Sequence, residues 1–152
     1  SLAGPGQNIG DVLVEQATKM DPKLGELTQP VIDQLKQGKT VTDYPNALES
    51  VFKADIQPFM INWMEYYPTE LIKELDMPIL LINGTKDLQV SENEAELLKA
   101  ANKKATLKII ENMNHVLFEI KGDNLENSKS YNESFRPISP QLIISITEFM
   151  SS

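Results

Sequence analysis

The chain has 152 residues, of which 41% are hydrophobic and 24% are charged, so it is long and apolar enough for one globular domain with a core. Its net charge of −8, with no run of Lys and Arg, argues against a nucleic-acid or anionic-membrane partner, since both need a basic face. The absence of cysteine excludes disulfides, thiolate metal sites and a cysteine nucleophile, and the longest apolar run, 77–82, is too short to span a bilayer.

The first half of the chain shows helical patterns that prolines interrupt. Apolar residues at helical spacing predict a helix over 11–20, and Asp21-Pro22 predicts the cap and first residue of a second helix. Pro30 inside this second helix predicts a kink or two short helices, and Gly38 predicts its end. Further short helical segments are predicted over 45–53, 56–66 and 70–75.

The second half begins with the pattern of a parallel sheet. The apolar run 78–83, closed by Gly84, is typical of a strand buried on both faces. Ser91, with Glu94 three residues later, predicts a capping box that opens a helix. Alternating residues over 105–110 predict a second strand. The crossover between the strands is long enough for a helix, which places the strands parallel.

The end of the chain is predicted as a loop followed by one helix. The stretch 121–136 is polar and predicts a loop, whereas Ser139-Pro140 predicts the start of a helix. The apolar stripe of this helix is Leu142, Ile143, Ile146, Phe149 and Met150. Two parallel strands are too few for a doubly wound domain, and the chain opens at Ser1 without an initiator Met. We therefore expect a start inside a longer precursor that supplies the rest of the sheet.

Two residues with acid–base chemistry follow the two predicted strands. Asp87 lies just past Gly84, and His115, the one histidine of the chain, lies just past the strand 105–110. Taken singly, such an Asp is usually a turn or cap residue and such a His a loop or core residue. Ligands and catalytic groups gather beyond the carboxyl ends of parallel strands, so both side chains are expected at one edge of the sheet. Their joint placement favours a catalytic pair.

The residues around this pair resemble the α/β-hydrolase family. Residues 78–90 look like its strand-Gly-x-x-Asp-x-x-Val segment, and Asn112-Met113-Asn114-His115 is similar to its Gly-Met-Asn-His turn. The order of acid before base is also that of the family. Residues 1–6 resemble the segment after the nucleophile strand and helix. Residues 131–132 and 137–142 resemble the tail of bacterial serine hydrolases and esterases, some of them exported. The compartment of this chain therefore stays open.

The resemblance implies an α/β fold in two parts. Residues 1–75 would form the end of a core strand plus a helical cap region, mainly over 10–75. Residues 76–152 would form the C-terminal α/β part of the hydrolase core, with strand, helix, strand and helix in that order. Asn112 departs from the family pattern, in which Gly is common, but Asn tolerates positive φ better than most residues.

The implied activity is acyl transfer by a serine hydrolase of the carboxylesterase type. His115 would take a proton from a serine hydroxyl, and Asp87 would hold the imidazole. No Gly-x-Ser-x-Gly occurs in the chain, so neither the nucleophile nor its oxyanion donors are expected here. The chain is therefore predicted to be inert without its missing N-terminal half.

Other candidate residues are weaker. The aromatic residues Phe59 and Trp63 are predicted either as helix core or, by the cap resemblance, as lining of a substrate pocket. The acidic residues at 92, 94 and 96 lack a His or Cys partner, so neither a metal nor a cofactor is expected.

Three classes of function remain open from the sequence. The first is a serine hydrolase acting on a small ester or acyl substrate. In the second, the same fold uses an aspartate nucleophile, as in a dehalogenase or epoxide hydrolase. The third is a non-catalytic binding module derived from a hydrolase. In each class an exposed sheet edge would favour pairing with the missing half or with a second copy of the chain.

Overall fold

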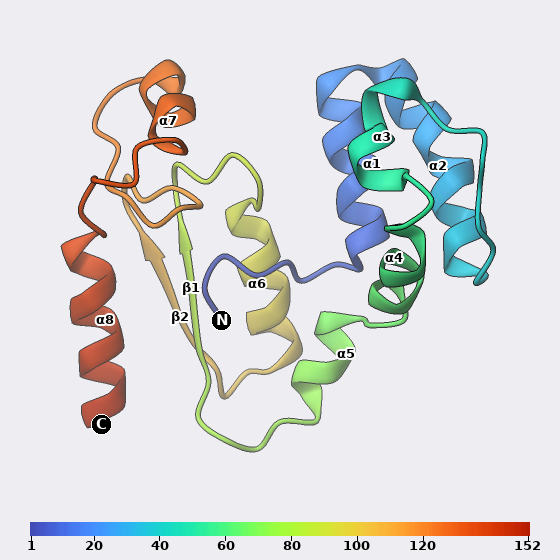
Figure 1. Ribbon diagram of the computed structural model, residues 1–152. Coiled ribbons are helices and arrows are strands. Elements are labelled where there is room, and N and C mark those ends of the chain that lie inside the picture. Colours follow the sequence, from blue (N-terminus) through green and yellow to red (C-terminus); the bar gives the residue numbers. More distant parts are fainter. The chain divides into compact units, whose positions relative to one another are not determined.

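A computed structural model describes residues 1–152 as a mixed α/β chain with eight α-helices, one short 3-10 helix and two parallel strands (Figure 1). The chain divides into two compact units. Residues 1–6 and 72–152 form an α/β unit, and residues 7–71 form a helical unit. The division expected from the sequence fell at residue 75, with residues 1–6 grouped with the helices.

The sheet of the α/β unit is built on β1 (Leu80–Gly84) and β2 (Thr106–Ile110). The two strands are parallel, with Leu80 opposite Thr106 and Gly84 opposite Ile110, so the predicted strands and their direction are confirmed. Residues 1–3 run along the other edge of β1. The Ser1 amine donates to the Leu80 carbonyl at 2.7 Å, and Ala3 N donates to the Ile82 carbonyl at 2.8 Å. These bonds place residues 1–6 in this unit.

Helices cover both faces of this sheet, because successive side chains of a strand point to opposite sides. Leu81 packs with Leu98 of α6 (Glu92–Ala101). Its neighbour Ile82 packs instead with Leu142 of α8 (Pro140–Ser151). In Figure 1, α6 and α8 accordingly lie on either side of the strands. The carboxyl ends of both strands therefore open into loops above a sandwich of helix, sheet and helix.

A helix interrupts the segment that the sequence predicted as a loop. Residues Asn124–Ser130 form α7, and Asp123 caps it by accepting hydrogen bonds from Leu125 N and Glu126 N, both at 3.0 Å. The loop prediction for 121–136 was therefore wrong over α7. The helix has no apolar stripe, since the residues it buries are the polar Asn127 and Ser130.

Two details at helix ends and faces also differ from expectation. The Ser91 hydroxyl makes no cap bond, and the Glu94 carboxylate instead accepts a hydrogen bond from Gly6 N at 2.8 Å, so the predicted capping box is wrong. The apolar stripe predicted for α8 is only partly buried. Leu142 is in the core, whereas Ile143 is 57% exposed and Met150 79% exposed.

The helical unit begins with two long helices, α1 (Ile9–Met20) and α2 (Pro22–Lys36). Asp21 caps α2, as predicted, by accepting a hydrogen bond from Lys23 N at 2.9 Å. Pro30 does not divide α2, because it lies on the exposed side of the helix, where water can solvate the carbonyl that it leaves unpaired. Gly38 adopts a φ of 75° just beyond the helix, which confirms it as the terminator.

Short elements complete the helical unit. They are the 3-10 helix η1 (Asn46–Leu48), α3 (Glu49–Phe52), α4 (Gln57–Met64) and the start of α5 (Pro68–Lys73), which continues into the α/β unit. The core consists of Val31, Ile32, Leu35, Val41, Phe52, Met60 and Met64. The buried Gln57 amide accepts from Val41 N at 2.7 Å and donates to the carbonyls of Val41 and Phe52 at 2.6 Å. It thereby ties the loop after α2 to α3.

Candidate functional site

The turn after β1 holds Asp87 rigidly. Asp87 N donates to the Gly84 carbonyl at 3.1 Å, and one carboxylate oxygen, Oδ1, accepts from Gln89 N and Val90 N, both at 2.8 Å. The side chain is only 1% exposed. Two backbone donors thus fix one carboxylate oxygen and leave the other, Oδ2, for a different partner.

The turn after β2 presents His115. Asn112 adopts a φ of 61° at the start of this turn, in the left-handed region that Asn tolerates. Gly84 allows the turn to approach β1 closely, because a Cβ there would lie 2.0 Å from the Met113 carbonyl oxygen. Lys86 N donates to that same carbonyl at 2.9 Å. The loops that carry the predicted acid and base are therefore bonded to each other.

Asp87 and His115 meet at this edge of the sheet, as the sequence predicts. Asp87 Oδ2 lies 3.0 Å from His115 Nδ1. A proton on Nδ1 is donated to the carboxylate, which leaves the lone pair of the neutral ring on Nε2. The His115 side chain is 29% exposed, and no group of the chain hydrogen-bonds to Nε2. Nε2 is therefore the atom free to exchange a proton with a substrate or nucleophile.

The electrostatics of the pair favour a charged imidazole. The hydrogen bond to Asp87 raises the pKa of His115 above its usual value of 6.5, and the carboxylate charge adds to this effect. Partial burial of the ring acts in the opposite direction and lowers the pKa. The net rise means that Asp87 stabilises the imidazolium form, which a general base must adopt after taking a proton.

Tyr131, directly after α7, contributes a buried hydroxyl beside this pair. Burial raises the pKa of the phenol and the Asp87 charge raises it further, whereas polar groups of Leu88, Gln89 and His115 oppose the rise. The hydroxyl has no hydrogen-bond partner of ordinary geometry. Sequence reasoning noted Tyr131 only within the resemblance of the tail, because a single Tyr in a polar stretch carries no signal of its own.

The two aromatic residues predicted as core or pocket lining lie on the surface of α4. Phe59 is 61% and Trp63 42% exposed, so neither belongs to the helix core. Their rings contact each other, with centroids 5.3 Å apart. Met60 and Met64 occupy the buried face of the same helix instead. The role of Phe59 and Trp63 in a substrate pocket stays a prediction.

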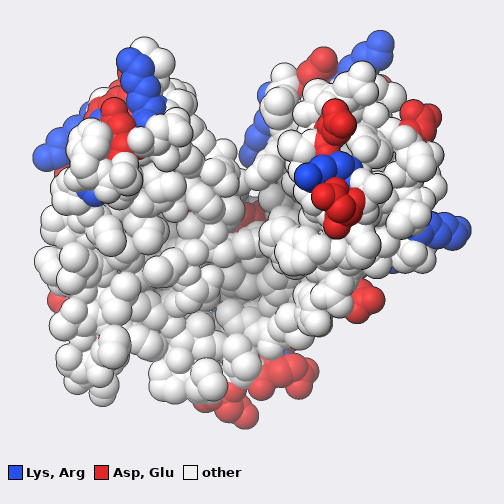
Figure 2. Space-filling view, viewed as in Figure 1, with Lys and Arg blue, Asp and Glu red and all other residues white.

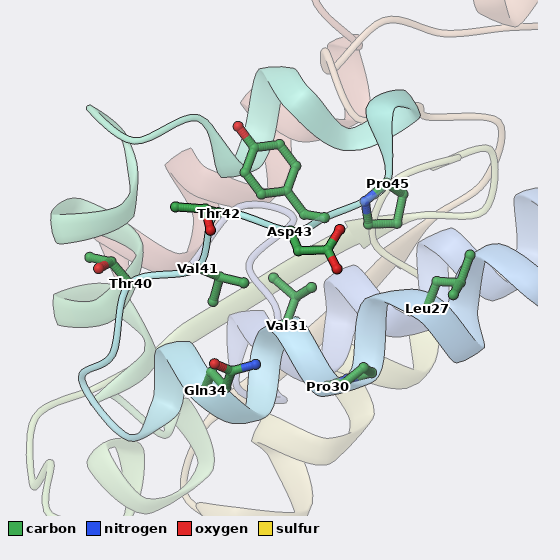
Figure 3. Close-up of a pocket in the computed structure, with 10 residues that line it drawn as sticks. Leu27, Pro30, Val31, Gln34, Thr40, Val41, Thr42, Asp43 and Pro45 are labelled. Atoms are coloured by element: carbon green, nitrogen blue, oxygen red, sulfur yellow. The ribbon is translucent and has the colours of Figure 1, made fainter.

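A separate cavity of about 530 Å³ lies within the helical unit. Its walls come from α2, through Leu27, Pro30 and Val31, and from the loop 40–45 (Figure 3). Asp43 is the one carboxylate among the lining residues, and neither Phe59 nor Trp63 is among them. The cavity therefore has the size of a small-molecule site but brings no acid–base pair to it.

Three further features of the structure are its candidate metal ligands, its surface charge and the length of its helices. No group of three or more His, Cys, Asp or Glu side chains is arranged to hold a metal ion. On the face drawn in Figure 2, Lys and Arg are interspersed with Asp and Glu, most densely at the upper left of the view. None of the helices has the length and apolar character that crossing a membrane requires.

Comparison with known proteins adds little to this geometry. No protein family matches the chain, and a comparison with curated proteins finds no relative. Among solved structures, the chain is similar to the esterase RhEst1 from Rhodococcus sp. ECU1013, at 16% identity and a TM-score of 0.32. The match covers 88% of this chain and 50% of the esterase, so the chain spans half the length of that protein. A likeness of this degree carries no argument about the fold or the activity of the chain.

Proposed function

We propose that Asp87 and His115 are the acid and base of a hydrolase that acts on a small ester or acyl substrate. The observation that carries this proposal is the 3.0 Å contact between Asp87 Oδ2 and His115 Nδ1 beyond the carboxyl ends of two parallel strands. A structural ion pair would also explain the contact, but the partly exposed ring and the unpartnered Nε2 favour proton transfer. The nucleophile is a hydroxyl outside these 152 residues.

The chemistry of the pair follows from its hydrogen bonds. His115 Nε2 removes the proton of the hydroxyl as the oxygen attacks the acyl carbon, and later delivers that proton to the leaving group. Asp87 keeps the other ring proton on Nδ1 and stabilises the imidazolium, while Gln89 N and Val90 N hold the carboxylate in place. The chain without its nucleophile can bind and orient but cannot form an acyl intermediate.

The test uses the polypeptide encoded with any residues that precede Ser1 in its reading frame. We expect hydrolysis of an unactivated short-chain ester and labelling by a serine-directed phosphonate. Both are lost in His115→Ala, and Asp87→Asn lowers kcat by roughly 10³–10⁴-fold, because the neutral amide no longer selects the Nδ1–H tautomer. Lys103→Ala, an exposed position on the same unit, is the matched control. Activated esters are avoided, since a free imidazole attacks them by itself.

Two results contradict the proposal. Ester hydrolysis that survives His115→Ala would remove the base from the mechanism. Labelling of the 152-residue chain alone would show that the nucleophile lies within it. Hydrolysis of a haloalkane or epoxide without phosphonate labelling would instead support the alternative with an aspartate nucleophile.

A further inference from the structure

A buried polar cluster connects α7 to the two turns of the candidate site. Asn114, Asn127 and Ser130 are each 0% exposed. Asn114 Nδ2 donates to Asn127 Oδ1 at 3.0 Å and to Ser130 Oγ at 2.8 Å. Asn127 Nδ2 donates in turn to the Lys86 carbonyl at 2.6 Å. Each of the two amides therefore uses both its oxygen and its nitrogen in hydrogen bonds away from water.

The ends of this cluster are the direct neighbours of the acid and the base. Lys86 precedes Asp87, and Asn114 precedes His115. Asn127 is the one side chain that bonds to both sides, through its oxygen to the turn of His115 and through its nitrogen to the turn of Asp87. It thus adds a buried side-chain link between the two turns to the direct bond from Lys86 N to the Met113 carbonyl.

The turn of His115 needs such external support. Asn112 and Leu117, on either side of His115, have φ values of 61° and 68°, and the left-handed region is costly for a residue such as leucine. Backbone in this conformation persists only where several surrounding contacts hold it in place. Asn114 Oδ1 supplies one restraint by accepting from Phe118 N at 2.9 Å. The Thr85 hydroxyl, which accepts from Asn112 N at 2.8 Å, supplies a second, and the cluster with α7 adds to them.

We propose that Asn127 is a positioning residue that holds Asp87 and His115 at hydrogen-bonding distance. A role of Asn127 in catalysis rests on the function proposed above. Its effect on the hydrogen bond between Asp87 and His115 does not. A satisfied network inside a low-dielectric interior is rigid, and loss of one member leaves buried polar groups unpaired and loosens the link between the two turns. A residue that only stabilised the fold would not change the electrostatics of His115.

The test is the pKa of His115, followed by NMR through the ring protons of the one histidine. In Asn127→Ser and Asn127→Leu, both neutral, we expect the pKa to lose most of its rise above 6.5, because the hydrogen bond to Asp87 is the main cause of that rise. Ser128→Ala, an exposed position on α7, should leave it unchanged. In the catalytic polypeptide, Asn127→Ser should lower kcat by about 10–100-fold with little effect on KM.

The outcomes separate this inference from the proposed function. A folded Asn127→Ser protein with the wild-type His115 pKa would overturn the positioning role and leave the pair intact. Where both Asn127 variants fail to fold, Ser130→Ala removes the bond that Ser130 Oγ accepts from Asn114 and the bond that it donates to the Asn127 carbonyl, and an unchanged His115 pKa there would overturn the positioning role equally. Asp87→Asn is the reference: if it leaves the His115 pKa unchanged, the pair itself fails, whatever Asn127 does.

Discussion

Asp87 uses its two carboxylate oxygens for different tasks. Oδ1 ends the turn after β1 by accepting two backbone hydrogen bonds, and Oδ2 contacts His115. An Asn at this position keeps an acceptor for the turn but loses the charge that favours the imidazolium. The Asp87→Asn variant therefore isolates the electrostatic contribution of the pair from its structural one.

The first prediction concerns stability and pH. The folded pKa of His115 is raised above its unfolded value of 6.5, so the stabilisation from the pair is complete below pH 6.5 and is lost as pH rises through the folded pKa. Urea unfolding from about pH 5 to pH 9 should show the wild type's advantage over Asp87→Asn shrinking as pH rises. Asp76→Asn, at an exposed ion pair, should show no such trend. A difference that grows with pH would contradict the linkage.

Gly84 provides the second prediction. A methyl group there would meet the Met113 carbonyl oxygen at 2.0 Å and its carbon at 2.6 Å, both in the backbone that leads to His115. Gly84→Ala should therefore destabilise the fold by about 1–3 kcal/mol in chemical denaturation. Gly122→Ala is the control, because its Cβ would meet the carboxylate end of the Glu126 side chain and not backbone. Equal stability of the two variants would argue against the close approach.

Tyr131 leads to a third prediction, in which a substitution stabilises the fold. Its buried hydroxyl loses contact with water and gains no hydrogen-bond partner of ordinary geometry. Removing it in Tyr131→Phe should raise the free energy of unfolding by about 1 kcal/mol. Tyr67→Phe, with an exposed side chain, should change it little. A clear loss of stability in Tyr131→Phe would mean that the hydroxyl has a partner in solution.

Local sequence could identify only some of these residues. Asp87 and His115 were predictable because each follows an apolar strand and parallel strands end at one edge. Asn127 was not, since it acts through contacts with Lys86 and Asn114 that are distant in sequence. Its neighbourhood reads as a polar loop, and no spacing rule distinguishes a buried Asn from a solvated one.

At the scale of elements, apolar patterning was a good guide where a helix or strand buries apolar residues. It located β1, β2 and the crossover helix α6, because all three pack apolar side chains in the core. It failed for α7, which is fixed by a cap and by polar contacts. It overstated the buried stripe of α8, whose Ile143 and Met150 are exposed, because periodicity marks a face without stating what covers it.

The caps of α6 and α7 give a fourth prediction. Asp123 bonds to two backbone amides at the start of α7, whereas the Ser91 side chain makes no cap bond at the start of α6. Asp123→Ala should therefore cost about 1 kcal/mol of stability, and Ser91→Ala clearly less. Thermal unfolding of the two variants beside the wild type measures the difference. A larger loss in Ser91→Ala would show that its hydroxyl does cap α6.

At the scale of the whole molecule, the α/β unit leaves polar backbone and apolar side chains uncovered. β1 is paired on both edges, by β2 and by residues 1–3, but β2 is paired only with β1. Several large apolar side chains of the unit are also exposed: Leu125, Phe135, Ile138, Ile143, Ile144 and Met150. An open strand edge beside uncovered apolar surface favours association.

The fifth prediction follows from this surface. The purified 152-residue chain should sediment as a dimer or larger species at micromolar concentration, and the association should weaken on dilution. Ile144→Lys should reduce it, because a charge on the exposed face of α8 opposes burial there. Ser50→Lys, at an exposed position of the helical unit, controls for added charge. A stable monomer would show that these groups are adequately solvated in the isolated chain.

The ring nitrogens of His115 report directly on its pairing with Asp87. His115 is the only histidine of the chain, and its titration can be observed without a nucleophile. Long-range proton–nitrogen NMR across a pH titration reports both its pKa and its neutral tautomer. The pairing with Asp87 predicts a pKa above 6.5, a neutral ring protonated on Nδ1, and loss of both features in Asp87→Asn. A pKa at or below 6.5, with an Nε2–H tautomer that Asp87→Asn does not change, would contradict the account.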